Sequence, residues 1–250
     1  MRKLIVFIYI VVTASIFTFL SFRPEFFWII LSFTPLIVII VTAILIGRSF
    51  NDFIKTIPPI IFITSVQLFI IFTHLVRWQE IGVFIFALIL LGFYVSQWFD
   101  FPTSIRLKGA HFSFFDVMSL AIIFFVLVNL FNLSSSFGIS LYVVMLGVIL
   151  LGFVMIFFNL WASELPPGIG FFYGLLFSVI LFEIFIVLSF WSIDPLAKSL
   201  LLSVIYYTYW GFLKLRLGRS FYFYKIIPYI VIATAVFAFV LKTVTWVPYY

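Results

Sequence analysis

Residues 139–161 read ISLYVVMLGVILLGFVMIFFNLW, a run of 23 positions without one charged side chain. An α-helix rises about 1.5 Å per residue, so this run is long enough to cross a hydrocarbon core about 30 Å thick. Its backbone N–H and C=O groups would meet no water there and must pair within the segment, as a helix allows. Residues 139–161 therefore predict a transmembrane helix.

The rest of the chain repeats this pattern of apolar runs and short polar gaps. Of its 250 residues, 66% are hydrophobic and 9% are charged. A soluble protein of this size could not bury so many apolar side chains, and no gap is long enough for a soluble domain. We therefore expect an all-α integral membrane protein with a single polytopic domain, residues 1–250.

Hydropathy predicts nine spans, or eight if one weak span does not cross. They are Leu4–Phe22, Phe26–Ile46, Ile57–Val76, Ile81–Phe99, Phe112–Leu133, Ile139–Trp161, Gly168–Trp191, Leu196–Leu213 and Ile226–Val247. The first span is preceded by cations, as in a signal peptide, but its apolar region is too long and no good cleavage site follows. We expect residues 1–25 to be a retained signal anchor.

Lysines and arginines in the gaps orient the chain. A cytoplasmic N-terminus places ten of the 14 cations on the inner side and four on the outer side, the bias found in cytoplasmic loops. We expect a multi-pass protein of the plasma or inner membrane with an external C-terminus. The tryptophans agree, because all lie near span ends, where indole rings favour headgroups: Trp28, Trp78, Trp98, Trp161, Trp191, Trp210 and Trp246.

The hairpins 26–80, 81–138, 139–194 and 195–250 are candidate parallel repeats with a period of about 56 residues. The best match joins LIGRSFNDFIKTIPPI at 45–60 to RLGRSFYFYKIIPYI at 216–230. Apolar matches arise easily in membrane sequences, but the shared Gly-Arg-Ser-Phe and the following Lys do not. Proline would then sit in the first turn of a helix, where its missing N–H costs least.

Cations of the inner gaps lie at the expected height of anionic headgroups. The candidate contacts with anionic lipid are Arg48, Lys55, Arg106, Lys108, Arg216, Arg219 and Lys225.

Glu183 is the carboxylate placed deepest in a predicted span, about eight residues from its outer end. An ionisable group at that depth costs about 2.5–3.5 kcal/mol on insertion scales and marks a functional position by default. It could serve a proton or a substrate, but an ion pair with Lys198 or Lys242 is favoured. The candidate outer polar site comprises Glu183, His74, Lys198, Lys242, Asn129 and Asn132.

Other polar positions predict structural roles. Asp116 lies one turn into its span, where we expect it to complement the helix dipole and to pair with Lys108 and His111. A mid-membrane amide such as Gln67 usually bonds a neighbouring helix. The GxxxG pattern of Gly170 and Gly174 permits a close helix contact.

The sequence contains none of the common catalytic or phosphate-binding motifs and no cysteine. His74 and His111 are expected near opposite membrane faces, so we expect no metal and no cofactor. The net charge of +6 is explained by the loop cations, without nucleic acid as a partner.

The interpretation we favour is a non-catalytic structural or assembly subunit of a membrane complex, with lipids and other membrane-protein subunits as partners. One alternative is a transporter or flippase-like carrier of a hydrophobic or lipid-linked substrate. The other is a membrane-embedded lipid-modifying enzyme with Glu183 or Asp116 as its base.

The predicted orientation can be tested with topology reporters. A reporter fused after Arg106 should be cytoplasmic and one fused after Asp194 should be external, because the cation bias places these gaps on opposite sides. Paired phosphatase and fluorescent-protein fusions measure this. The reverse pattern would overturn the orientation.

Overall fold

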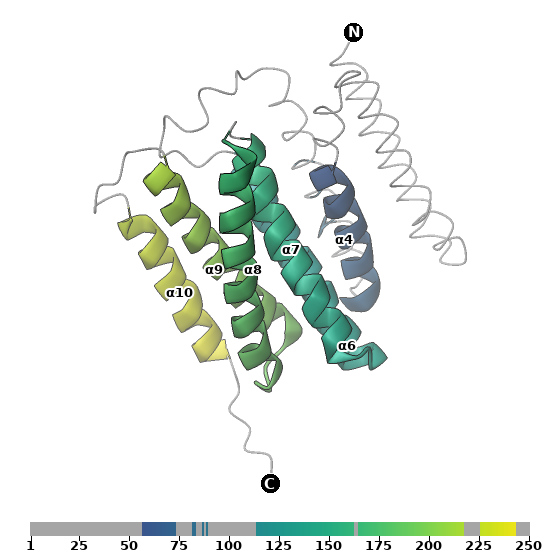
Figure 1. The fold of residues 1–250 in the computed structure, drawn as a ribbon. Helices are drawn as coiled ribbons and strands as arrows, with labels where there is room; N and C mark the ends of the chain where they lie inside the picture. The colour runs from purple at the N-terminus through teal and green to yellow at the C-terminus, as the bar shows by residue number, and fades with distance from the viewer. Residues whose placement is uncertain are drawn as a thin grey trace. The chain divides into compact units, whose positions relative to one another are not determined.

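A computed structural model describes residues 57–73, 82–83, 87, 89, 114–162, 165–217 and 226–243. The described elements are helices, and no strand occurs in these ranges, in agreement with the predicted all-α class (Figure 1). They are α4 (Ile57–Thr73), α6 (Phe114–Phe137), α7 (Leu141–Ala162), α8 (Pro167–Ser189), α9 (Pro195–Leu217) and α10 (Ile227–Thr243).

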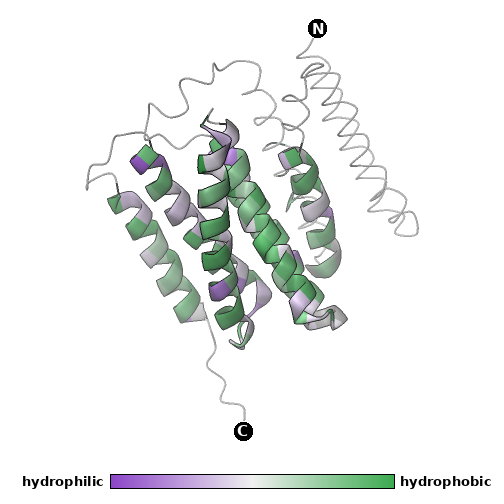
Figure 2. Ribbon diagram, viewed as in Figure 1, coloured by the Kyte–Doolittle hydropathy of each residue, from purple (hydrophilic) through white to green (hydrophobic). Residues whose placement is uncertain are grey.

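Three helices are long and apolar enough to cross a membrane, over Asp116–Ser135, Leu141–Trp161 and Pro167–Ser189. The apolar stretches of α4 and α10 are shorter, and α9 carries more polar positions, which are purple in Figure 2. A membrane protein is thus supported, but nine spans are not confirmed. The predicted spans Leu4–Phe22 and Phe26–Ile46, and most of Ile81–Phe99, lie outside the described residues.

The helix starts follow local chemistry. The Leu196 N–H donates to Asp194 Oδ1 at 2.7 Å, so Asp194 caps α9 just before Pro195. Pro58 and Pro228 lie in the first turns of α4 and α10, as predicted. At the other end of a helix, α6 stops at Gly138, whose φ of 62° is a conformation that a Cβ disfavours.

Contacts divide the chain into two units, and α6 contributes to both. The first unit covers 1–101 and 117–126. In it, Phe62 and Phe69 of α4 meet Phe125 of α6 edge to face, with ring centroids 6.0 and 5.0 Å apart. These aromatic contacts hold α4 to the middle of α6.

The second unit covers 102–116 and 127–250 and contains α7 to α10. Figure 1 shows α8, α9 and α10 side by side, with α7 against α8. Small residues allow α7 and α8 to approach closely. A Cβ on Gly174 would lie 3.1 Å from the Phe153 carbonyl oxygen, and one on Gly152 would lie 3.1 Å from the Ser178 Cα. The GxxxG pattern therefore does permit the close contact predicted for it.

A single glycine also sets the contact between α9 and α10. The ring of Tyr229 lies directly over Gly211, in space that a Cβ would occupy. The same ring packs on Tyr207, with centroids 4.9 Å apart. One tyrosine of α10 therefore fixes this helix against α9.

Hydroxyl groups inside these helices are satisfied by their own helix. Ser199 and Ser203 of α9 donate to the carbonyl oxygens four residues before them, each at 2.7 Å. Ser178 of α8 donates to the Leu175 carbonyl at 2.8 Å. Such bonds mean that these three serine hydroxyl groups need no water as an acceptor at membrane depth.

We predict that Gly174→Leu lowers the thermal stability of the purified protein. The added side chain collides with the α7 backbone, and overpacking of this kind costs about 1–3 kcal/mol. Thermal unfolding in detergent measures the change. The matched control is Gly168→Leu on the same helix, where a Cβ meets nothing within 4 Å, and equal losses in both variants would contradict the prediction.

Candidate functional site

A buried ion pair joins the first turn of α6 to the last turns of α9. The Lys214 ammonium donates to Asp116 Oδ2 at 2.7 Å, and both side chains are 9% exposed. The Trp210 indole N–H donates to Asp116 Oδ1 at 2.6 Å. Both carboxylate oxygens therefore have strong donors inside the second unit.

The face of α9 explains how these donors reach one carboxylate. Tyr207, Trp210 and Lys214 lie three and four residues apart, so they share one side of the helix. All three are buried. Asp116 is the only acidic residue in the first turn of α6, where it also complements the positive end of the helix dipole.

The cation that pairs with Asp116 is not one of those expected from the sequence. Asp116 lies in the first turn, as predicted, but its described partners are Lys214 and Trp210. Lys108 and His111 lie outside the described residues. Lys214 was expected in a gap after a span ending at Leu213, whereas α9 continues to Leu217 and buries it.

Trp210, which lies near the end of a predicted span, is 5% exposed, and its indole N–H bonds the Asp116 carboxylate. The spacing of Tyr207, Trp210 and Lys214 was the signal in the sequence that could have revealed this face. A donor-rich helix face needs an acceptor, and Asp116 is the carboxylate expected at the same membrane side.

A second buried polar contact joins α7 to α9. The Asn159 amide donates to the Tyr206 hydroxyl at 2.6 Å, and both residues are buried. The Tyr206 ring meets Phe177 of α8 edge to face, with centroids 5.6 Å apart. Three helices thus meet at Tyr206, a position that hydropathy alone did not single out.

The residues of the expected outer polar site occupy different environments. Glu183 of α8 and Lys242 of α10 are exposed, while Asn129 and Asn132 of α6 are buried. His74 lies outside the described residues, so their joint site stays a prediction. Gln67, buried within α4, has the burial expected of an amide at membrane depth.

Lys198 does not form the ion pair that was favoured for Glu183. Its ammonium lies 3.5 Å from the Ser189 carbonyl oxygen, to which it donates, and 5.5 Å from the centre of the Phe131 ring. Phe131 in turn stacks on Phe185 at 4.6 Å. Among the described residues, no ion pair engages Glu183 with either Lys198 or Lys242.

Of the cations expected to contact anionic lipid, Arg216 is described, and it is exposed in the last turn of α9. The others lie outside the described residues: Arg48, Lys55, Arg106, Lys108, Arg219 and Lys225.

Across the described ranges, no three His, Asp or Glu side chains gather as metal ligands would. Comparison of the chain with protein families, with curated proteins and with solved structures gives no match.

We predict that Lys214→Met destabilises the protein strongly. It leaves the Asp116 carboxylate buried without its countercharge, a change that typically costs about 3–5 kcal/mol. Thermal unfolding in detergent, followed by tryptophan fluorescence, measures the loss. The double variant Asp116→Asn with Lys214→Met should recover much of it, because both charges are gone and Trp210 keeps an acceptor.

The control for lost charge is Lys242→Met, which removes an exposed cation from α10. It should change stability by no more than about 0.5 kcal/mol. A loss for Lys214→Met that is no larger than this control would show that the ion pair does not hold α6 to α9.

Proposed function

We propose that this chain is a non-catalytic structural or assembly subunit of a membrane complex, and that the outward face of α8 binds the partner. The observation that carries the proposal is an exposed carboxylate, Glu183, in the middle of an apolar helix face.

The interior polar groups support a structural role. Asp116 is held by Lys214 and Trp210, and Asn159 bonds Tyr206. The hydrogen bonds of these groups join one helix to another. A general base would instead need a carboxylate oxygen that is free to take a proton from a substrate, so the contacts of Asp116 disfavour its use in an enzyme.

Glu183, unlike Asp116, lies on an exposed helix face. Five residues, which we name the α8 stripe, recur at intervals of three or four along α8 and are all exposed: Phe172, Leu175, Val179, Glu183 and Val187. Within the described part of the chain, no hydrogen bond or ion pair engages the Glu183 carboxylate. Apolar stripe residues suit lipid, but the carboxylate does not.

The depth of Glu183 makes its exposure costly. It lies five residues past Ser178, the midpoint of α8, or roughly 7–8 Å along the axis. At such depth polar side chains normally face other protein. A partner helix that offers a cation or a hydrogen-bond donor would satisfy Glu183 and cover the apolar stripe residues on either side.

A different protein fits this face better than a second copy of the chain. The α8 sequence contains no Lys, Arg or His, so two copies packed through their α8 stripes would bring two carboxylates together without a countercharge. The complementary group must then come from a surface other than the α8 stripe, and we assign it to another protein. This argument favours a hetero-complex.

The carrier remains the second candidate, because the exposed Glu183 carboxylate could equally bind a substrate or a proton, and a groove of about 490 Å³ between α8 and α9 offers a separate apolar space. In a carrier, Glu183 would serve substrate or proton rather than a partner subunit. The two candidates therefore differ in what a neutral residue at position 183 does to assembly.

We predict that Glu183→Gln releases the partner. A hydrogen bond to a charged group contributes about 1.5–3 kcal/mol, so association should weaken roughly ten- to hundredfold. Photocrosslinkers placed at Val179 and Val187 in native membranes should capture one protein other than this chain, and the capture should fall by that factor in the variant.

Two controls make the result specific. A crosslinker at Val231, which is 58% exposed on α10, should not capture the same protein. The thermal stability of the isolated Glu183→Gln protein should match the unmodified chain, because the carboxylate makes no bond within the described residues. Unchanged crosslinking in the variant, with loss of a transport activity, would favour the carrier instead.

A further inference from the structure

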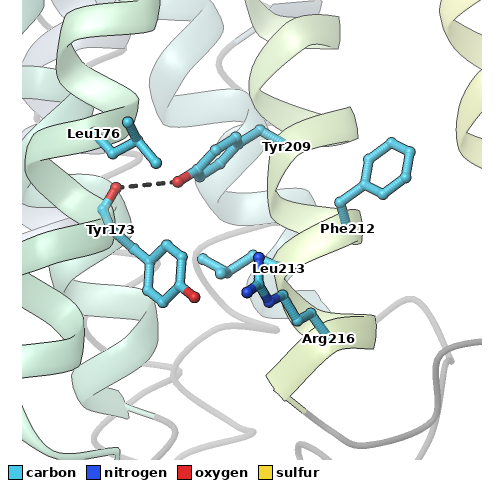
Figure 3. Close-up of a pocket in the computed structure, with 6 residues that line it drawn as sticks. All are labelled: Tyr173, Leu176, Tyr209, Phe212, Leu213 and Arg216. Carbon is cyan, nitrogen blue, oxygen red and sulfur yellow. Dashed lines mark hydrogen bonds between the residues drawn. The ribbon is translucent and has the colours of Figure 1, made fainter.

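A groove of about 490 Å³ opens between α8 and α9, and its described lining includes neither residue of the Asp116–Lys214 pair and none of the α8 stripe (Figure 3). Its lining comes from two residues of α8 and four of α9: Tyr173, Leu176, Tyr209, Phe212, Leu213 and Arg216. Its volume lies within the range of about 300–1,000 Å³ typical of small-molecule sites. It is therefore large enough for a ligand rather than for water alone.

The walls of the groove are apolar or aromatic, and its polar groups are few. The Tyr209 hydroxyl donates to the Tyr173 carbonyl at 3.3 Å, which uses that donor and ties α9 to α8. Leu176 is 42% exposed and Phe212 is 36% exposed, so the groove opens outward. An apolar groove that faces the bilayer suits a hydrocarbon chain.

One end of the groove carries Arg216, the one charged residue among the described residues that line it. Figure 3 shows the Arg216 guanidinium and the Tyr173 phenol at that end, nearest the end of α9. Arg216 is exposed and lies one residue before the last residue of the helix. Under the orientation predicted above, this end lies at the inner headgroups, where anionic lipids concentrate.

Charge complementarity identifies the headgroup. A guanidinium presents a planar fork of donors that matches phosphate oxygens bidentately. The other cation nearby in sequence, Lys214, is held by Asp116 on a different side of α9. Arg216 is thus the cation of α9 that remains available to an anion at the groove.

We propose that the α8–α9 groove binds one anionic phospholipid. An acyl chain lies between α8 and α9 against Leu176 and Leu213, and the Arg216 guanidinium holds the phosphate. The site couples an apolar chain to a single charge, so it selects a lipid and not a free anion.

The test uses the full chain purified in detergent, with phosphatidylglycerol, phosphatidylcholine and inorganic phosphate as probes. Native mass spectrometry counts bound lipid, and thermal unfolding reports stabilisation. We expect one tightly bound phosphatidylglycerol, at least about tenfold weaker binding of phosphatidylcholine, and no competition by inorganic phosphate.

Variants separate the charge from the groove. Arg216→Gln should weaken phosphatidylglycerol binding about tenfold or more, whereas the matched control Lys242→Gln should leave it unchanged. Leu176→Trp, which fills the groove and keeps the charge, should abolish the tight site. Leu213→Trp tests the same point from α9 if the first variant does not fold.

Three results would overturn the proposal. Equal losses in Arg216→Gln and Lys242→Gln would show attraction by net charge alone. Equal binding of the two lipids would remove the role of the guanidinium, leaving Arg216 as a complement to the dipole of α9. Tight phosphatidylglycerol binding that survives a filled groove would place the lipid elsewhere.

Discussion

The arrangement of the second unit depends on the buried ion pair of Asp116 and Lys214. This pair joins the beginning of α6 to the end of α9, two segments that lie far apart in the sequence of the unit. Helices in a bilayer gain little from hydrophobic association, since lipid tails are as apolar as leucine. Close packing and buried polar contacts must then specify how the helices are arranged. The ion pair, the Asn159–Tyr206 bond and the glycine contacts of α7 with α8 supply these constraints.

The sequence could predict features that depend on local hydropathy, but not those that depend on contacts between distant residues such as Asp116 and Lys214. Helix positions follow from local hydropathy, and each described helix begins within two residues of its predicted start. Ends were harder, because α6 and α9 each run four residues past Leu133 and Leu213. In α9 the extension carries Lys214, whose burial depends on a carboxylate 98 positions away. No local property of the sequence encodes such a partner.

The candidate site was predictable in its residue types but not in its pairing. Asp116 and Glu183 were both identified as carboxylates inside predicted spans, and hydropathy treats them alike. The structure distinguishes them by direction, since one faces two donors and the other faces outward. Which way a side chain points around a helix depends on the rotation of that helix, and uniformly apolar neighbours leave this rotation unspecified in the sequence.

Two cations of α9 make that rotation definite. Lys214 and Arg216 are separated by two residues, or about 200° around the axis, and one is buried while the other is exposed. Turning α9 in either direction would break the first contact or bury the second charge. The burial of Lys214 and the exposure of Arg216 together fix the rotation of α9 about its own axis. Any conformational change that keeps the Asp116–Lys214 ion pair must therefore move the end of α9 and the start of α6 together.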